Sequence, residues 1–298
     1  MKLDSLLTEQ VNPDSQGIDA RPTPEILQVI NRQDEMVASA VAAEIPQIAK
    51  AVDRIVEAMQ GGGRLFYIGA GTSGRLGVLD AAECPPTFQV SPDLVQGIIA
   101  GGEAALARST EVSEDDKSAG ARDLGARGFV SQKDVLVGIA TSGRTPYVLG
   151  AIAFAREKGA LTIGISCTPD SELSRAVEIA ITPLAGPEVI AGSTRMKAGT
   201  ATKLVLNMIS TAVMIRLGHV YGNLMVNVQP RNSKLRDRAR RIVAEAAAVS
   251  DERAAELLAA AGDNSKVAIV MARRDLDRAT AEACLARAGG RISEALKI

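Results

Sequence analysis

Five short apolar runs in the middle of the chain constrain its fold more than any other feature of the sequence. They span residues 64–70, 94–102, 134–140, 161–167 and 177–183. Helical patterns begin between them, near Ser73, Ser113, Thr145 and Ser171. This alternation predicts an α/β fold with a doubly wound, mostly parallel five-stranded sheet. Such sheets bind ligands beyond the carboxyl ends of their strands, so the functional site is expected there.

The segment before the sheet reads as an arm followed by helices, over residues 1–60. Residues 1–22 are polar and rich in turn residues. Thr23-Pro24-Glu25 resembles a helix start, with Thr23 as the N-cap and a proline at the first helical position. The helical pattern continues to Gln60, but Pro46 should break it because proline has no backbone N–H to donate.

The sheet domain is predicted to occupy residues 61–230 and to end with a long apolar helix from about Thr194 to Gly218. A small all-α domain is expected over residues 231–298, where the composition turns to Ala, Arg and Glu. Residues 257–269 and 284–296 resemble each other at an offset of 27 residues. This weak repeat favours two small helical units, of a helix-turn-helix or ubiquitin-associated type.

The composition excludes several classes of partner. Lys and Arg number 34 against 35 Asp and Glu, so no overall basic field would draw the chain to nucleic acid or to an anionic membrane. The three cysteines are far apart, which argues against a disulfide framework and a thiolate zinc site. The N-terminus lacks the pattern of a signal peptide. We therefore expect a cytoplasmic protein that uses no metal and no cofactor.

The first strand runs directly into a turn of glycine and hydroxyl residues, Gly69 to Gly77. Backbone N–H groups there, together with Thr72 and Ser73 beside Gly71, could surround an anion at the start of a helix. The turn has no Walker lysine, so a nucleotide is the weaker interpretation. An ordinary tight turn between strand and helix is the structural alternative.

The third strand ends in a similar way, at residues 140–146, with Ser142, Arg144 and Thr145 in the turn. Two such turns at one edge of a sheet, without the carboxylates of a magnesium site, favour a sugar monophosphate held without a metal. Two helix caps in one fold would also explain the pattern.

Carboxylates are the candidate acid–base groups. The only histidine, His219, follows the apparent end of a helix, where a structural role beside the helix dipole is expected. Glu83 stands where Pro85-Pro86 should cut the first helix short, near the first turn. Glu114 begins a helix after the second strand, where it could also be only a partner of the helix dipole.

A glycine-rich segment, residues 186–203, precedes the long apolar helix and carries Ser193, Arg195 and Lys197. Its cations could neutralise the negative charge of a phosphate, which the hydroxyl groups of the two turns cannot do. A loop that caps a buried helix is the alternative.

These motifs resemble those of the N-acetylmuramic acid 6-phosphate etherases, which belong to the SIS (sugar isomerase) fold and are relatives of the glucokinase regulatory protein. The resemblance extends from about residue 6 to the C-terminus. It rests on GAGTSGRLG, DAAECPP, GIATSGRTPYV, GNLMV and above all on residues 186–203. It implies an SIS-type sheet and a homodimer without a metal, with the proton donor at Glu83 and a second active-site residue at Glu114.

The resemblance also implies a reaction, cleavage of the lactyl ether of N-acetylmuramic acid 6-phosphate to N-acetylglucosamine 6-phosphate and D-lactate. An open-chain C1 aldehyde would acidify the C2 proton and permit elimination across C2–C3. One carboxylate then accepts that proton while another protonates the departing oxygen, and water adds afterwards. Our hypothesis makes Glu114 the base and Glu83 the acid.

Two other functions are compatible with parts of the pattern. A sugar-phosphate isomerase of the SIS type needs the same proton abstraction but would release no lactate. A sugar-phosphate-sensing regulator usually carries a second SIS domain, and this chain has room for one.

Overall fold

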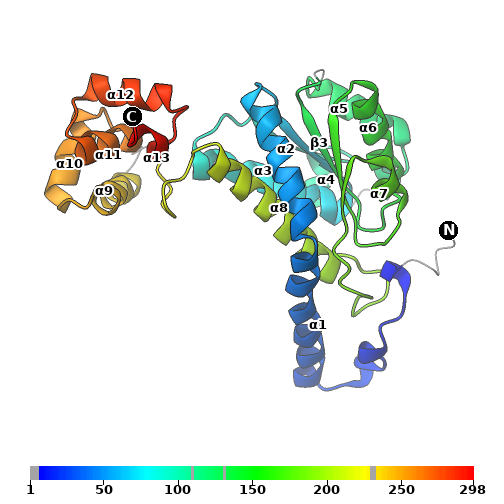
Figure 1. Ribbon diagram of the computed structural model, residues 1–298. Coiled ribbons are helices and arrows are strands. Elements are labelled where there is room, and N and C mark those ends of the chain that lie inside the picture. The colour runs from blue at the N-terminus through cyan, green and yellow to red at the C-terminus, as the bar shows by residue number, and fades with distance from the viewer. Residues whose placement is uncertain (1–6, 109–110, 130–131, 229–232) are drawn as a thin grey trace. The chain divides into compact units, whose positions relative to one another are not determined.

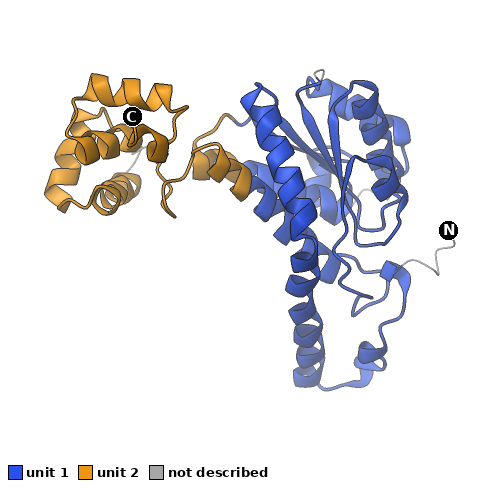
Figure 2. Cartoon of the chain, viewed as in Figure 1, with its two compact units in different colours: residues 1–82, 92–210 blue, residues 83–91, 211–298 orange. Residues whose placement is uncertain are grey.

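The computed structural model describes residues 7–108, 111–129, 132–228 and 233–298. The chain forms two compact units, residues 1–82 with 92–210 and residues 83–91 with 211–298 (Figure 2). The predicted domain boundary near residue 230 lies outside the described residues.

The first unit contains a five-stranded sheet in which every paired strand is parallel (Figure 1). The strands follow the order β2-β1-β3-β4-β5, and all five predicted strands are confirmed. Their bounds are β1 Leu65–Gly69, β2 Val95–Ile99, β3 Val135–Ile139, β4 Leu161–Ile165 and β5 Ile179–Ile181.

Helices cover both faces of this sheet because its strands are apolar on both sides. Phe66 and Ile68 pack in one core with residues of α5 (Lys117–Ala126), α6 (Pro146–Glu157) and α7 (Glu172–Ala176). Tyr67 points to the other face, where Gly77 of α3 approaches it closely. Figure 1 shows α2 and α3 on that side. The doubly wound arrangement is thereby confirmed.

Two consecutive helices precede the sheet, α1 (Thr23–Ala43) and α2 (Ile45–Gln60). They meet at Glu44, so the predicted break beside Pro46 is confirmed. The predicted N-cap is wrong: Pro22 occupies the cap position and Thr23 is already helical. The arm before α1 forms three short 3₁₀ turns, η2 Leu7–Glu9, η3 Pro13–Ser15 and η4 Ile18–Ala20.

Helix α3 (Gly71–Phe88) is longer than predicted, because Pro85 and Pro86 lie inside it. Proline removes a donor, but its fixed φ is compatible with a helix. The backbone N–H of Gln89 donates to the Pro85 carbonyl at 2.9 Å, so helical bonding continues past both prolines. Glu83 therefore lies within a continuous helix, twelve residues after Gly71.

The long apolar helix is α8 (Lys197–Arg216), slightly shorter than the predicted range. Among the described residues it is the one helix long and apolar enough to cross a membrane, and 56% of its most apolar window is buried inside the protein. That burial is typical of a core helix.

Two short elements, α4 Ala104–Ala107 and η5 Glu111–Glu114, follow β2.

The second unit has its own core, built by five helices of the C-terminal part of the chain. They are α9 Ser233–Ala247, α10 Asp251–Ala260, α11 Ser265–Arg274, α12 Arg278–Arg287 and α13 Ile292–Ala295. The predicted repeat corresponds to two helix-turn-helix pairs, α10–α11 and α12–α13. Gly262 and Gly289, at the same repeat position, have φ of 62° and 60°, a left-handed conformation that favours glycine.

The surroundings of His219, in the second unit, disfavour its charged form. Burial and the nearby Lys266 charge lower its pKa, and this outweighs the expected benefit of a cation beside the helix dipole. The Asn227 side chain lies 2.6 Å from His219 Nδ1 and donates to the Phe88 carbonyl at 2.8 Å.

Acidification should therefore weaken the second unit through His219. As the pH is lowered below about 6.5, the imidazole binds a proton in the unfolded chain before it does so in the folded chain. The free energy of unfolding therefore decreases as the pH decreases, until the pH has passed the pKa of the folded state. Each tenfold difference in proton affinity costs about 1.4 kcal/mol. Thermal unfolding of wild type and His219→Gln across this range should show a larger loss of stability on acidification in wild type than in the variant. The single imidazole NMR signal titrating above pH 6.5 would contradict this.

Candidate functional site

The two predicted turns lie side by side at the point where the winding of the sheet reverses. The neighbouring strands β1 and β3 end in register, with Gly69 opposite Ile139. From β1 the chain winds to β2 on one side and later to β3 on the other. A parallel sheet opens a crevice at such a point, beyond the strand ends. The first turn (residues 70–74) and the second turn (residues 140–145) flank this crevice.

The first turn requires glycine for two different reasons. Gly71 has φ of 53°, which strains other residues. Gly69 and Gly74 bring the strand end against the first helical turn, and a Cβ on Gly69 would lie 2.7 Å from the Gly74 nitrogen. Ser73 is buried and Thr72 half-buried. The backbone of α3 thus begins at the crevice with its hydroxyl residues beside it.

Glu114 reaches this first turn from a distant part of the sequence. A Cβ built on Gly71 would lie 3.1 Å from Glu114 Oε1, so the carboxylate borders the turn. Glu114 is half-buried and ends η5. The next helix, α5, starts later than predicted because Asp116 caps it, accepting from the backbone of Ser118 and Ala119. Hydrogen bonds from the Ser118 hydroxyl, from Arg122 and from the Ala119 backbone lower the pKa of Asp116 to about 2.

The second turn is built by contacts with the segment after β4. The Gly143 carbonyl accepts from Leu173 N at 2.9 Å, and the Thr141 carbonyl accepts from Cys167 N at 2.8 Å. Ser142 and Thr145 are half-buried and Arg144 is exposed. Thr145 occupies the N-cap of α6 but makes no side-chain capping bond. This argues against the alternative that the hydroxyls serve only as caps.

The start of α8 also meets the first turn. A Cβ on Gly199 would lie 3.6 Å from Thr72 Cγ2. Ser193 is half-buried and Arg195 is exposed. Lys197, expected to contact a substrate, is instead 1% exposed, and its ammonium donates to Gln33 Oε1 at 2.8 Å. The structure thus gives Lys197 a partner inside the protein.

Glu83 is exposed and belongs to the second unit, whereas the turns and Glu114 belong to the first. The same motif contains a carboxyl group that the sequence reasoning missed, Asp80, which is 5% exposed. It accepts from Asn207 at 2.7 Å and Ser210 at 3.0 Å, and so joins α3 to α8. Burial raises its pKa. The first residue of DAAECPP could have been singled out, but nothing in the sequence indicates its burial.

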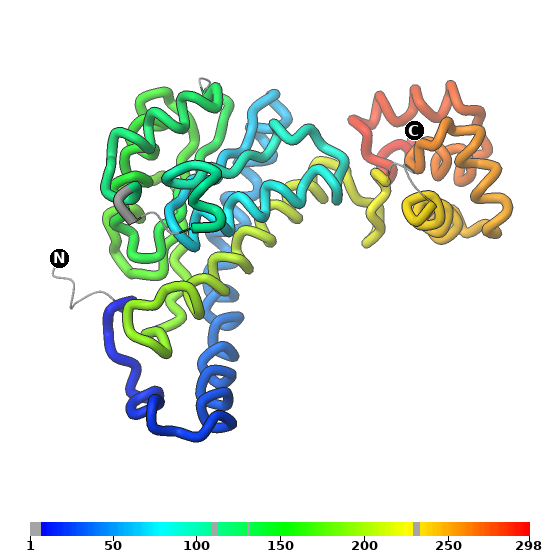
Figure 3. Tube along the Cα trace, turned by 180° about the vertical axis from the view of Figure 1, so that it is seen from behind, coloured from blue at the N-terminus to red at the C-terminus, as the bar shows by residue number. Residues whose placement is uncertain are grey.

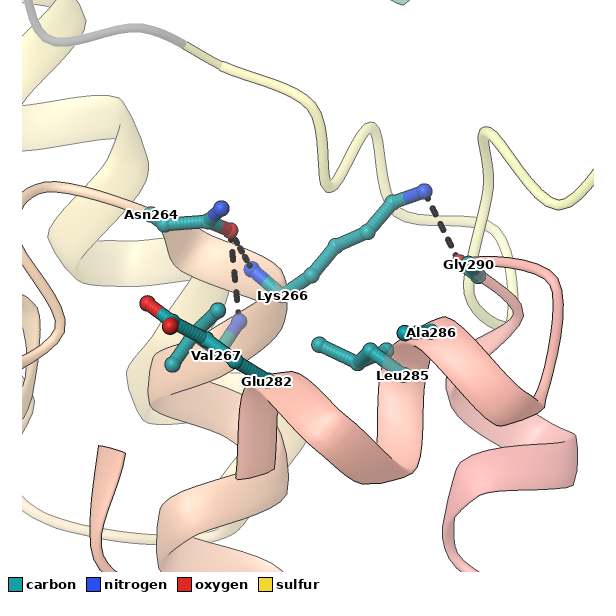
Figure 4. Close-up of a pocket in the computed structure, with 7 residues that line it drawn as sticks. All are labelled: Asn264, Lys266, Val267, Glu282, Leu285, Ala286 and Gly290. Atoms are coloured by element: carbon teal, nitrogen blue, oxygen red, sulfur yellow. Dashed lines mark hydrogen bonds between the residues drawn. The ribbon is translucent and has the colours of Figure 1, made fainter. Parts of the chain in front are cut away.

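A pocket of about 260 Å³ lies among the C-terminal helices (Figure 4). None of the predicted site residues lines it. Its Lys266 ammonium donates to the Gly218 and Gly290 carbonyls at 2.8 and 3.0 Å, and burial lowers its pKa. The lining residues are Asn264, Lys266, Val267, Glu282, Leu285, Ala286 and Gly290. In the part of the chain that the structure describes, no cluster of three His, Cys, Asp or Glu side chains could hold a metal ion.

Comparison with known proteins identifies the family. The glucokinase regulatory protein N-terminal SIS domain matches residues 47–156, and the SIS domain matches residues 119–212. An N-acetylmuramic acid 6-phosphate etherase from Glaesserella parasuis is 57% identical over 291 residues, which are 98% of this chain and 95% of the relative. The chain belongs to the N-acetylmuramic acid 6-phosphate etherase family.

A second etherase, from Caldanaerobacter subterraneus, is 51% identical over 298 residues, covering 100% of this chain and 97% of the relative. A solved phosphoheptose isomerase from Neisseria gonorrhoeae has a TM-score of 0.49 and 15% identity, covering 64% of this chain and 98% of that one. The family assignment confirms the resemblance that the sequence motifs indicated.

Proposed function

We propose that this protein cleaves the D-lactyl ether of N-acetylmuramic acid 6-phosphate, giving N-acetylglucosamine 6-phosphate and D-lactate. The observation that carries the proposal is the identity of 57% and 51%, over almost the full length, to relatives named for this etherase activity. The position of the two turns at the switch point of the sheet supports it, since sugar phosphates are small anionic ligands suited to such a crevice.

In this proposal the two turns hold the sugar phosphate. Backbone N–H groups at the start of α3 donate to phosphate oxygens, as helix N-termini commonly do. Hydroxyl groups of both turns add neutral hydrogen bonds, and exposed guanidinium groups supply charge. The proposed ligands are Gly71, Thr72, Ser73, Ser142, Arg144, Thr145, Ser193 and Arg195.

The proposed reaction is an elimination followed by addition of water. Glu114 accepts the C2 proton of the open-chain sugar, whose C1 aldehyde stabilises the carbanion as an enolate. The C3–O bond then breaks, and Glu83 protonates the departing lactate oxygen. Water adds at C3 of the unsaturated aldehyde and a proton returns to C2. The border that Glu114 shares with Gly71 supports its role as the base.

We further propose that the enzyme is a cytoplasmic homodimer and that Glu83 serves the site of a partner subunit. Helix α1 leaves Leu27 and Met36 exposed at 60% and 44%, and α8 leaves Met208 exposed at 40%. A second copy of the chain would remove this apolar surface from water. The exposure of Glu83 is consistent with a residue shared across such an interface.

A D-lactate assay on the purified protein with N-acetylmuramic acid 6-phosphate tests the function. In ²H₂O the sugar product should carry deuterium at C2, and in H₂¹⁸O the label should enter the sugar C3 hydroxyl and not the lactate. A sugar-phosphate isomerase would release no lactate from this substrate. Binding of the substrate without turnover would instead support the regulator alternative and reject the etherase.

A further inference from the structure

The N-terminal arm is fastened to the segment before α8 by three hydrogen bonds. The Asn12 side chain donates to the Pro187 carbonyl at 3.0 Å, and Ser15 Oγ donates to the Val189 carbonyl at 2.7 Å. The Gly192 N–H donates to the Thr8 carbonyl at 3.1 Å. Arm and segment are about 175 residues apart in sequence, so these contacts belong to the tertiary structure alone.

Gln33, on α1, is the centre of this attachment and is 4% exposed. Its Oε1 accepts from Lys197 Nζ at 2.8 Å and from Asn12 Nδ2 at 2.7 Å. Its Nε2 donates to Asp14 Oδ2 at 2.8 Å. The amide therefore uses both acceptor lone pairs and one donor in a single orientation. Helix α1, the arm and the start of α8 are joined at one side chain.

Glu188 is a further buried polar residue at the start of α8. It is 1% exposed, and its two oxygens accept from the backbone N–H groups of Lys197 and Ala198, each at 3.0 Å. The chain thus supplies its own anion to the positive end of α8. Because a buried polar group without a partner is costly, removing one member should loosen the others.

The segment held in this way carries Ser193 and Arg195 and leads into α8, whose Gly199 lies against Thr72 of the first turn. We propose that Lys197, Gln33 and Asn12 are positioning residues that fix the start of α8 against the first turn, and with it residues 190–196, so that the N-terminal arm is part of the architecture of the site. The proposal rests on the proposed function for the identity of the ligand. Lys197 then acts through the segment and does not touch the substrate.

The test uses the full-length variants Lys197→Met, Asn12→Ala and the double variant. Both single variants should raise the KM for N-acetylmuramic acid 6-phosphate about tenfold or more with a smaller change in kcat, since misplaced binding groups weaken substrate binding. The double variant should raise KM by less than the two single effects combined, because both substitutions act through Gln33. Lys50→Met removes an exposed lysine of α2 and should match wild type.

Hydrogen exchange of residues 186–197, followed by mass spectrometry without substrate, supplies a readout that does not need activity. Exchange should rise in both single variants and stay unchanged in Lys50→Met. Folded variants with unchanged exchange and unchanged KM would overturn the proposal. If wild type released no lactate, the proposed function would fail, but raised exchange would still support the attachment.

Discussion

Replacing Glu114 with glutamine is expected to lower lactate release by about 10² to 10⁴-fold and to stop deuterium uptake at C2. Glutamine keeps the size of the side chain that borders Gly71. It cannot accept a proton from carbon, so the first step of the elimination is lost while the fold remains. The measurement is the D-lactate assay together with NMR of the recovered sugar in ²H₂O.

The comparison with Glu83→Gln separates the two roles. If Glu83 only protonates the leaving oxygen, its variant should lose lactate release but still exchange the C2 proton. Glu157→Gln removes an exposed carboxylate at the end of α6 and should match wild type. Exchange that survives in Glu114→Gln and disappears in Glu83→Gln would reverse the assignment.

Local sequence signals were sufficient for most of the fold. Each strand is a short run of apolar residues ended by residues that permit a turn, so its position depends on its own neighbourhood. The break between α1 and α2 is also a local effect, since Pro46 lacks a backbone donor. The predicted end of the helix before Pro85 and Pro86 is wrong, because a proline excludes one hydrogen bond and does not by itself decide where a helix ends.

The environment of the site residues could not be predicted in this way, since it depends on contacts between distant segments. The sequence indicates that Lys197 is a cation near a glycine-rich segment. Its burial follows from Gln33, 164 residues away. The border between Glu114 and Gly71 likewise depends on how η5 returns to β1. The domain bounds 1–60, 61–230 and 231–298 and the catalytic roles stay predictions.

The close packing of α5 on α6 fixes the chain that follows Glu114, and two glycines permit it. A Cβ on Gly120 would lie 1.9 Å from the Tyr147 carbonyl oxygen, and one on Gly150 would lie 1.8 Å from the Lys117 carbonyl oxygen. Each glycine faces the backbone of the opposite helix. A methyl group at either position therefore meets atoms that no rotamer change can move.

Gly120→Ala should lower the free energy of unfolding by about 3 kcal/mol, because the two helices must separate to admit the methyl group. On the same helix, Gly125→Ala should raise it by roughly 0.5 to 1 kcal/mol, since alanine favours the helix and its Cβ would lie 3.7 Å from Phe154. Urea unfolding followed by circular dichroism gives both values. Equal stability of the two variants would contradict this account of the α5–α6 packing.

Because α5 begins three residues after Glu114, Gly120→Ala should also lower etherase activity at temperatures where the variant stays folded, and Gly125→Ala should not.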